Sequence, residues 1–180
     1  MKIYISPLSA IEEAIARHQP SHLISALGEE EMIETPAGIA PQRHLKLTMH
    51  DISEVRDGMI SPSTEHIGRL ISFIDEWDTT AAPLLVHCWA GISRSSAAAF
   101  IALCRINPDM PEEALARLLR EQAAFIYPNA LMVRHADALM GREGRMSRAI
   151  DAIGPGALAW EGNLFDVPAH PEALISSGEL

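Results

Sequence analysis

Apolar and polar positions follow strand-like and helix-like patterns in turn along most of the chain. Short apolar or alternating stretches predict four strands, at residues 3–5, 22–27, 45–49 and 83–86. Longer stretches with apolar residues every three or four positions predict helices between and after them. Strands that alternate with helices favour an α/β fold with a central, mostly parallel sheet of four to five strands flanked by helices.

Six helices are expected between and after these strands. Two of their starts match a capping box, in which a Ser or Asp side chain and a Glu three residues later satisfy free N–H groups of the first turn: Ser9–Glu12 and Asp109–Glu112. The other four helices carry apolar residues at helical spacing in residues 67–77, 95–106, 128–141 and 142–153.

The length of the chain bounds its organisation. Its 180 residues suit one domain, which we place at residues 1–153. An irregular C-terminal tail is expected at 154–180, where Gly and Pro recur without a sustained period. The longest apolar run, Ala97–Cys104, is much shorter than the ~20 residues of a membrane span, and the first residues do not resemble a signal peptide. We therefore expect a cytoplasmic protein that does not cross a membrane.

The charge of the chain limits its partners. A net charge of -10 argues against nucleic acid and anionic membranes, which bind clustered Lys and Arg. The net charge is -7 for residues 1–80, 0 for 81–128, +2 for 129–150 and -5 for 151–180. Any anion-binding site is therefore expected between residues 81 and 150.

The candidate chemistry lies in residues 86–95, VHCWAGISRS. A buried strand runs into a short loop and then a buried helix, so loop N–H groups converge at a helix N-terminus, where negative charge is stabilised. Gly91 lets the loop close where a Cβ would obstruct it. Arg94 adds a planar guanidinium that can hold two oxygens of a tetrahedral oxyanion. The pattern predicts a site for phosphate, sulfate or a thiolate.

Cys88 lies at the base of this expected anion site. Thiols at helix N-termini beside cationic groups titrate well below the ~8.5 of a free thiol. Cys88 is therefore expected to be a charged nucleophile at neutral pH, with Ser95 as a hydrogen-bond donor to the sulfur. Cys104, in an apolar helix, is expected to pack in the core.

The segment His87–Ser95 resembles the signature loop of the cysteine-based protein tyrosine phosphatases, and the short chain with late helices is similar to their dual-specificity branch. The resemblance implies that Cys88 attacks phosphorus to form a phosphocysteine, and that Ser95 stabilises the thiolate when it leaves. It implies no cofactor and no metal, and a phosphorylated protein or a small phosphomonoester as partner. The phosphate oxygens would be bound by the Arg94 side chain and by the backbone amides of Trp89, Ala90, Gly91, Ile92, Ser93 and Arg94.

Such a reaction needs a general acid that protonates the leaving oxygen, and in this family the acid is an Asp upstream of the cysteine. Asp51 lies 37 residues before Cys88, just after a predicted strand, and Asp57 lies 31 residues before it. We favour Asp51, because a strand end fixes its position better. The alternative for Asp51–Glu54 is a capping box.

Several other residues have two interpretations. His87 matches the family residue that orders the loop, or it is a buried structural imidazole. Asn129, after Pro128, matches the family residue that supports the signature loop, or it is a helix N-cap. Trp89 either forms the rim of the site or packs against the domain. Four arginines either attract a phosphorylated partner or form a solvated basic face: Arg134, Arg142, Arg145 and Arg148.

Three other functions stay open at this point. A rhodanese-type sulfurtransferase also holds a cysteine in a loop of this size, but Gly91, Arg94 and Ser95 with an upstream Asp favour phosphate. A catalytically silent phosphate-binding module usually lacks the Cys, the Arg or the acid, and all three are present. A lipid phosphatase is less favoured, because no basic residue lies between Cys88 and Arg94 to bind an inositide headgroup. The histidines complete no metal site with a Cys or carboxylate cluster.

Overall fold

The computed structural model describes residues 1–171, which contain one five-stranded sheet. The strands are β1 (Lys2–Pro7), β2 (His22–Leu27), β3 (His44–Thr48), β4 (Leu84–Cys88) and β5 (Phe165–Pro168). They stand in the order β3-β2-β4-β1-β5. The first four pair in parallel, and β5 pairs antiparallel with β1 at one edge. The predicted α/β class and mostly parallel sheet are confirmed.

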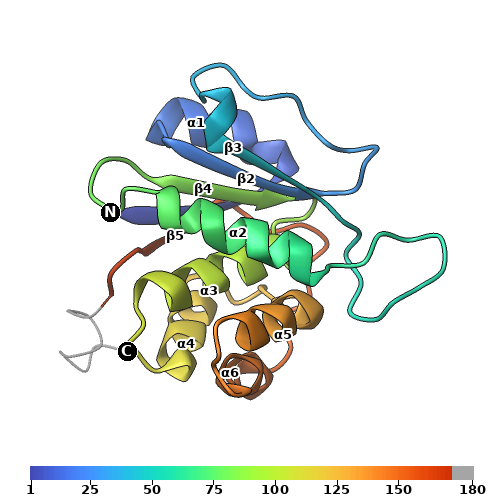
Figure 1. Ribbon diagram of the computed structural model, residues 1–180. Helices are drawn as coiled ribbons and strands as arrows, with labels where there is room; N and C mark the ends of the chain where they lie inside the picture. Colours follow the sequence, from blue (N-terminus) through green and yellow to red (C-terminus); the bar gives the residue numbers. More distant parts are fainter. Residues whose placement is uncertain (172–180) are drawn as a thin grey trace.

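Helices cover the two faces of the sheet unequally (Figure 1). One face carries α1 (Ile11–His18), and the other carries the remaining five helices. These are α2 (Thr64–Glu76), α3 (Arg94–Ile106), α4 (Glu112–Gln122), α5 (Ala130–Leu139) and α6 (Arg145–Ile153). The central helix of this layer is α3, which contacts β1, β2 and β4 as well as its neighbouring helices. No helix within residues 1–171 is long and apolar enough to cross a bilayer.

Alternate residues of each strand face opposite sides of the sheet, which divides the core in two. Ile24, Leu84 and Val86 pack into the large core between the sheet and the five-helix layer. Leu23 and Leu85 instead pack against α1 in the smaller core. Every residue of β4 is buried, as expected for a central strand with helices on both sides.

The parallel strands end at one edge of the sheet, and the candidate site lies at this edge. Cys88, the last residue of β4, stands in register with Pro7 of β1 and Ala26 of β2. The alternation along β4 puts Cys88 on the α3 side of the sheet and His87 on the α1 side. The chain then turns through a five-residue loop, residues 89–93, directly into α3.

The prediction of an irregular tail at residues 154–180 is wrong for its middle part. Residues 165–168 form β5, which pairs with β1. The edge of β1 offers unpaired backbone groups that a short extended segment can satisfy, so the strand forms without an alternating pattern of its own. Upstream of it, the N–H group of Gly162 donates to the carbonyl of Ala90, which holds this segment against the candidate site. Residues 172–180 lie outside the described residues.

Neither predicted capping box forms. Ser9 lies in a short 3-10 turn (Leu8–Ala10) before α1, and its hydroxyl donates to the carboxylate of Glu161. Helix α4 begins at Glu112 without a side-chain cap, and that carboxylate binds Arg142 and Arg145 instead. In both cases the side chain that local spacing assigned to the helix terminus instead binds a residue far away in the sequence.

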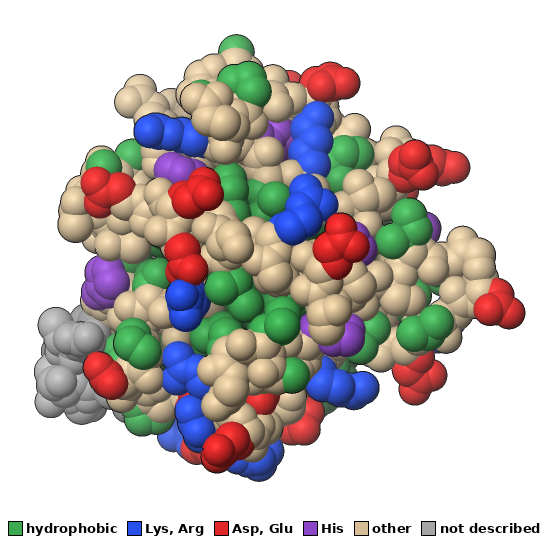
Figure 2. All heavy atoms as spheres, viewed as in Figure 1, with side chains coloured by type: hydrophobic (Ala, Val, Ile, Leu, Met, Phe, Trp, Pro, Cys, Tyr) green, Lys and Arg blue, Asp and Glu red, His purple; other side chains and the backbone are tan. Residues whose placement is uncertain are grey.

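Acidic and basic side chains are interspersed on the face shown in Figure 2. Two of the four C-terminal arginines have structural roles. Arg142 is buried and donates to the carbonyls of Cys104 and Pro108 and to Glu112. Arg145 shares the Glu112 carboxylate. These two residues join α3, α4 and α6, so neither a phosphate-attracting surface nor a solvated basic face describes them.

Candidate active site

The loop between β4 and α3 holds its carbonyl groups outward. The carbonyl oxygens of Trp89, Ala90, Ile92 and Ser93 each accept a hydrogen bond from the backbone of another part of the chain. The donors are the N–H groups of Leu8, Gly162, Tyr127 and Asn129. No backbone N–H group in residues 89–94 donates to any other group within residues 1–171. Because a peptide N–H points opposite to its carbonyl, these free N–H groups line the inner side of the loop, as in an anion-binding site.

Gly91 permits the loop to lie directly against the end of β1. Its φ is +70°, and a Cβ there would stand 2.6 Å from the N atom of Pro7 and 2.9 Å from the carbonyl carbon of Ser6. Any other residue would need both a left-handed backbone and a displacement of β1. The obstruction expected at this position is thus the backbone of the neighbouring strand.

Cys88 lies at the base of the loop. Its Sγ atom is 3.2 Å from Oγ of Ser95, which belongs to the first turn of α3. Cys88 is 1% exposed, so almost none of this residue is in contact with solvent. Cys104 is buried in the large core, as expected, and desolvation by burial raises the pKa of its thiol.

The side chain of Arg94 extends from the start of α3 toward the segment that follows β3. Its Nη1 atom donates to the carbonyl of Met49 at 2.8 Å, and its Nε atom lies 3.9 Å from Oδ2 of Asp51. Nε is buried and has no hydrogen-bond partner within residues 1–171. A buried N–H group without a partner is rare in proteins. This one is available to an oxyanion held by the loop.

Asp51 lies beside the loop, three residues after the end of β3. Its Oδ1 atom accepts hydrogen bonds from Oγ of Ser93 at 2.6 Å and from Nδ2 of Asn129 at 2.8 Å. Its side chain is 38% exposed and so remains accessible to solvent. No helix begins at residues 51–54, so the capping-box alternative is wrong. Asp57 lies in an exposed turn and forms no hydrogen bond or ion pair within residues 1–171.

Asn129 fulfils both of its interpretations. Its Oδ1 atom accepts hydrogen bonds from the N–H groups of Leu131 and Met132 and caps α5. Its Nδ2 atom donates to Asp51, and its backbone N–H donates to the carbonyl of Ser93. One residue therefore connects a helix terminus, the signature loop and the candidate acid.

His87 lies in a buried hydrogen-bonded chain on the α1 side of the sheet. Its Nε2 atom is 2.5 Å from Oγ of Ser25, whose hydroxyl is also 2.8 Å from Nε2 of His44. Nδ1 of His44 is 2.9 Å from Oγ1 of Thr35. Desolvation by burial lowers the pKa of His87 to about 3 and that of His44 to about 4, so both rings are neutral above pH ~5. His87 therefore fits the interpretation of a buried structural imidazole, and it directly precedes Cys88 in the chain.

Sequence reasoning missed four contributors to this arrangement. The Ser93 side chain was not expected to bind Asp51, and the Met49 carbonyl was not expected to bind Arg94. Ser25 was expected only as a position in the strand at residues 22–27, and His44 lies just before the strand predicted at residues 45–49. The available signal was Ser25, a small polar residue inside the otherwise apolar part of the strand at residues 22–27.

The structure also bears on the position of Trp89 and on the interpretation of the histidines. Trp89 is 44% exposed at the outer side of the loop, which fits a rim position better than packing. His18 stacks on the ring of Tyr4 with centroids 3.9 Å apart. Within residues 1–171, no group of three or more His, Cys, Asp or Glu side chains could hold a metal ion.

The arrangement of strands and helices resembles solved phosphatase structures. No protein-family model and no curated protein matches the sequence. The structure of DUSP15 is similar with a TM-score of 0.61 and 18% identity, over 83% of this chain and 90% of that one. The chain has the dual-specificity phosphatase fold. A human tyrosine phosphatase-like serine/threonine/tyrosine-interacting protein has a TM-score of 0.60 and 22% identity, over 78% of this chain and 92% of its own.

The dual-specificity phosphatase fold alone does not define the reaction. A third similar structure, PTPMT1 in complex with PI(5)P, has a TM-score of 0.55 and 14% identity, over 77% of this chain and 90% of that one. The three proteins thus include one described with a bound phosphoinositide and one named phosphatase-like. Fold can be shared by proteins of different activity, so function has to be argued from the residues of the site.

Proposed function

We propose that the protein is a metal-independent phosphomonoester hydrolase that forms a phosphocysteine on Cys88. The supporting observation is the set of free N–H groups in the loop that follows Cys88, together with the unpartnered Nε of Arg94. Three equatorial oxygens of a phosphoryl group need several donors at once, and a guanidinium with loop amides supplies them. The helix N-terminus behind the sulfur stabilises negative charge on both the thiolate and the phosphate.

In the first step the Cys88 thiolate attacks phosphorus, and the bond from phosphorus to the ester oxygen breaks. The leaving oxygen takes the bonding electron pair and receives a proton from Asp51, so an alcohol or phenol departs. In the free protein, Ser93 and Asn129 donate hydrogen bonds to Oδ1 of Asp51 and fix the position of this side chain beside the loop.

In the second step a water molecule attacks the phosphocysteine and gives a proton to the Asp51 carboxylate. The bond between phosphorus and sulfur breaks, and the electron pair returns to Sγ of Cys88 as a thiolate. Ser95, 3.2 Å from that sulfur, donates a hydrogen bond to it as it leaves. Inorganic phosphate then dissociates from the loop.

For the substrate we propose a phosphorylated protein, with phosphotyrosine first and phosphoserine or phosphothreonine as further substrates. The absence of Lys and Arg among residues 89–93 leaves a highly anionic inositide headgroup with one cation in the loop, Arg94. A single phosphoryl group needs no more than that. We also propose that the protein works in the cytoplasm.

Hydrolysis of an aryl phosphate in the presence of a chelator tests the proposal. We expect turnover that disappears in Cys88→Ser and falls at least about tenfold in Asp51→Asn, with Asp57→Asn as the matched control that keeps activity. Turnover that survives Cys88→Ser would overturn the mechanism. A loss of activity in Asp57→Asn instead would assign the general acid to Asp57 and leave the rest of the mechanism unchanged.

The same protein preparation tests two of the three other functions, the sulfurtransferase and the silent phosphate-binding module. Sulfur transfer from thiosulfate without phosphate-ester hydrolysis would indicate the sulfurtransferase. Binding of orthophosphate, measured by calorimetry, without any turnover would indicate the silent phosphate-binding module.

A further inference from the structure

A cavity adjoins the signature loop on the side of α5 and α6. Its volume is about 210 Å³, below the ~300 Å³ of the smallest common ligand pockets. Ser93 and Asn129, which both bind Asp51, form part of its wall, so the cavity shares residues with the candidate active site. A cavity of this size next to a phosphate site fits one side chain of a larger substrate.

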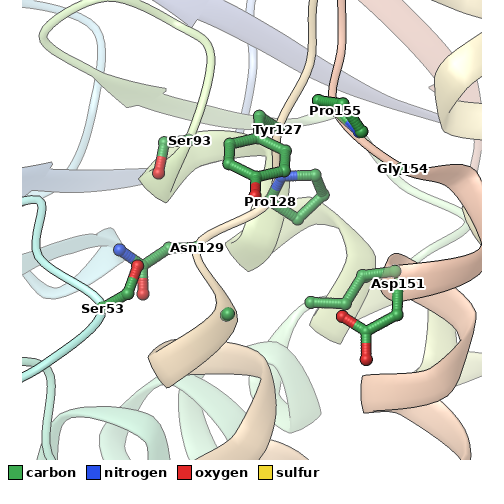
Figure 3. Close-up of a pocket in the computed structure, with 10 residues that line it drawn as sticks. Ser53, Ser93, Tyr127, Pro128, Asn129, Asp151, Gly154 and Pro155 are labelled. Atoms are coloured by element: carbon green, nitrogen blue, oxygen red, sulfur yellow. The ribbon is translucent and has the colours of Figure 1, made fainter.

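The walls of the cavity have distinct chemistry (Figure 3). Ser53, Ser93 and Asn129 lie on one side, and Asp151 of α6 lies on the opposite side. The ring of Tyr127 lies between them, and further apolar surface comes from the neighbouring Pro128, Ile150 and Pro155. An apolar wall with one carboxylate suits a long side chain with an apolar stem and a charged end.

Asp151 is the one charged residue among those that line the cavity. It is exposed and forms no hydrogen bond or ion pair through its side chain within residues 1–171. It lies in the last turn of α6, whose C-terminal end carries partial negative charge. Both features favour a cation in the cavity.

Arg120 is an opposing charge that lies behind residues of the cavity wall. Its guanidinium donates to the carbonyls of Ile153, Gly154 and Pro155 behind the cavity wall, and to Ile126. These bonds offset part of the helix dipole but leave the Asp151 carboxylate without a partner. The cavity therefore repels an acidic side chain and attracts a basic one.

We propose that this cavity is a specificity subsite for a Lys or Arg side chain of the phosphorylated substrate, next to the phosphorylated residue. The proposal rests on the proposed function, because the neighbouring loop must hold a phosphate. Because Ser93 belongs both to the loop and to the wall of the cavity, the basic residue lies near the phosphorylated one in the peptide sequence. The stem packs on Tyr127 and Pro155, and the charged end meets Asp151.

Binding of phosphotyrosine peptides to the Cys88→Ser protein tests the subsite without requiring turnover. Each peptide carries Arg, norleucine or Glu at one of the three positions on either side of phosphotyrosine. We expect an Arg peptide to bind about fivefold more tightly than its Glu counterpart at one position, since one exposed ion pair contributes little and repulsion of Glu adds to it. The preference should shrink at high salt.

Substitutions at Asp151 show whether that residue sets the preference. We expect Asp151→Asn to remove most of the Arg-over-Glu ratio and Asp151→Lys to reverse it. Asp109→Asn is the matched control, because Asp109 is an exposed acid beyond the C-terminal end of α3, away from the loop. The ratio should be unchanged there.

The outcomes separate this proposal from the proposed function. Equal Arg-over-Glu ratios in the parent and Asp151→Lys proteins would overturn the subsite, whether or not the enzyme turns over aryl phosphate. A reversed ratio would support it even if turnover is absent. Failure of both phosphotyrosine binding and aryl phosphate hydrolysis would overturn both proposals.

Discussion

Nδ2 of Asn129 donates a 2.8 Å hydrogen bond to Oδ1 of Asp51, while Oδ1 of the same side chain caps α5 through Leu131 and Met132. The amide thus makes two separable contributions, one to stability and one to the position of the proposed acid. Ser is as good an N-cap as Asn, because its hydroxyl oxygen can take the place of the capping Oδ1. Ser has no second polar atom in the place of Nδ2, which makes the bond to Asp51.

The Asn129→Ser variant should therefore keep the fold and lose the bridge to Asp51. The cap is kept, but the lost hydrogen bonds of Nδ2 to Asp51 and to the carbonyl of Ile52 should lower the free energy of unfolding by about 1 kcal/mol. We expect kcat to fall about tenfold for alkyl phosphates, which need protonation, and much less for an activated aryl phosphate. Urea unfolding and steady-state kinetics with the two substrates measure both effects.

Asn129→Ala is the matched comparison. It removes the cap as well, so about 1 kcal/mol more stability should be lost than in Asn129→Ser, with the same kinetic effect. Equal losses of kcat for alkyl and aryl phosphates in both variants would show that Asn129 does not act through the acid.

Local pattern was sufficient for most of the sheet and helices. The strand at residues 22–27 has the predicted bounds, and the buried strand at 83–86 extends by two residues to Cys88. β5 was missed because four residues that end at Pro168 carry no period. The capping boxes failed because Ser9 and Glu112 bind partners far away in sequence.

The candidate site also has one part that the sequence predicts and another that it does not. The residues from His87 to Ser95 are contiguous, so their motif and its place between strand and helix could be read directly. Ser25, His44 and Asp151 come from three distant segments. Their positions depend on strand register and helix packing, which a single sequence does not encode locally.

Gly91→Ala tests the close approach of the loop to β1. The new Cβ would meet backbone atoms of Pro7 and Ser6 at 2.6 and 2.9 Å, at a φ of +70°. We expect a loss of more than about 2 kcal/mol in the free energy of unfolding and at least about a tenfold loss of phosphatase activity. Gly141→Ala is the control, since its φ is +64° but no atom lies within 4 Å of the new Cβ. It should cost only about 1 kcal/mol, and equal costs would argue against the steric explanation.

Ser25 and Ser6 stand beside His87 in the two neighbouring strands. Removal of their hydroxyls should have different effects on the free energy of unfolding. Ser25 and Ser6 are the register partners of His87 in β2 and β1. Ser25→Ala leaves two buried imidazole nitrogens without a partner, so we expect a loss of about 1–3 kcal/mol. The Ser6 hydroxyl is buried with no partner in the described residues, so Ser6→Ala should be neutral or slightly stabilising. Urea unfolding measures both, and a similar loss in each variant would contradict this assignment.

The two neutral histidines predict how stability depends on pH. Desolvation lowers the pKa of His87 from 6.5 to about 3 and that of His44 from 6.5 to about 4. The unfolded chain therefore binds protons below pH 6.5 that the folded protein does not. The contribution of the two neutral rings to the free energy of unfolding is complete above pH ~6.5. It is lost as the pH falls toward 4, by up to about 1.4 kcal/mol per pH unit for each ring.

His44→Gln isolates one of these protons. Desolvation also lowers the pKa values of His18, His22 and His66, and their contribution is common to both proteins. As the pH falls from ~6.5 to ~5, we expect the free energy of unfolding of the variant to decrease less steeply than that of the parent. The difference between the two slopes should correspond to about one proton. Urea unfolding at several pH values gives the two slopes, and identical slopes would show that His44 titrates normally in the folded protein.

The two cysteines should differ sharply in their reaction with iodoacetate at neutral pH. The free loop N–H groups, Arg94 and the start of α3 should attract an anionic reagent to the loop beside Cys88. Burial raises the pKa of Cys104, which keeps it protonated. Mass spectrometry of the folded protein should therefore find one modified cysteine, Cys88, with protection by orthophosphate and no uptake in Cys88→Ser. Cys104→Ala should react as the parent does; modification of Cys104 first, or indifference to orthophosphate, would mean that the loop does not bind anions beside Cys88.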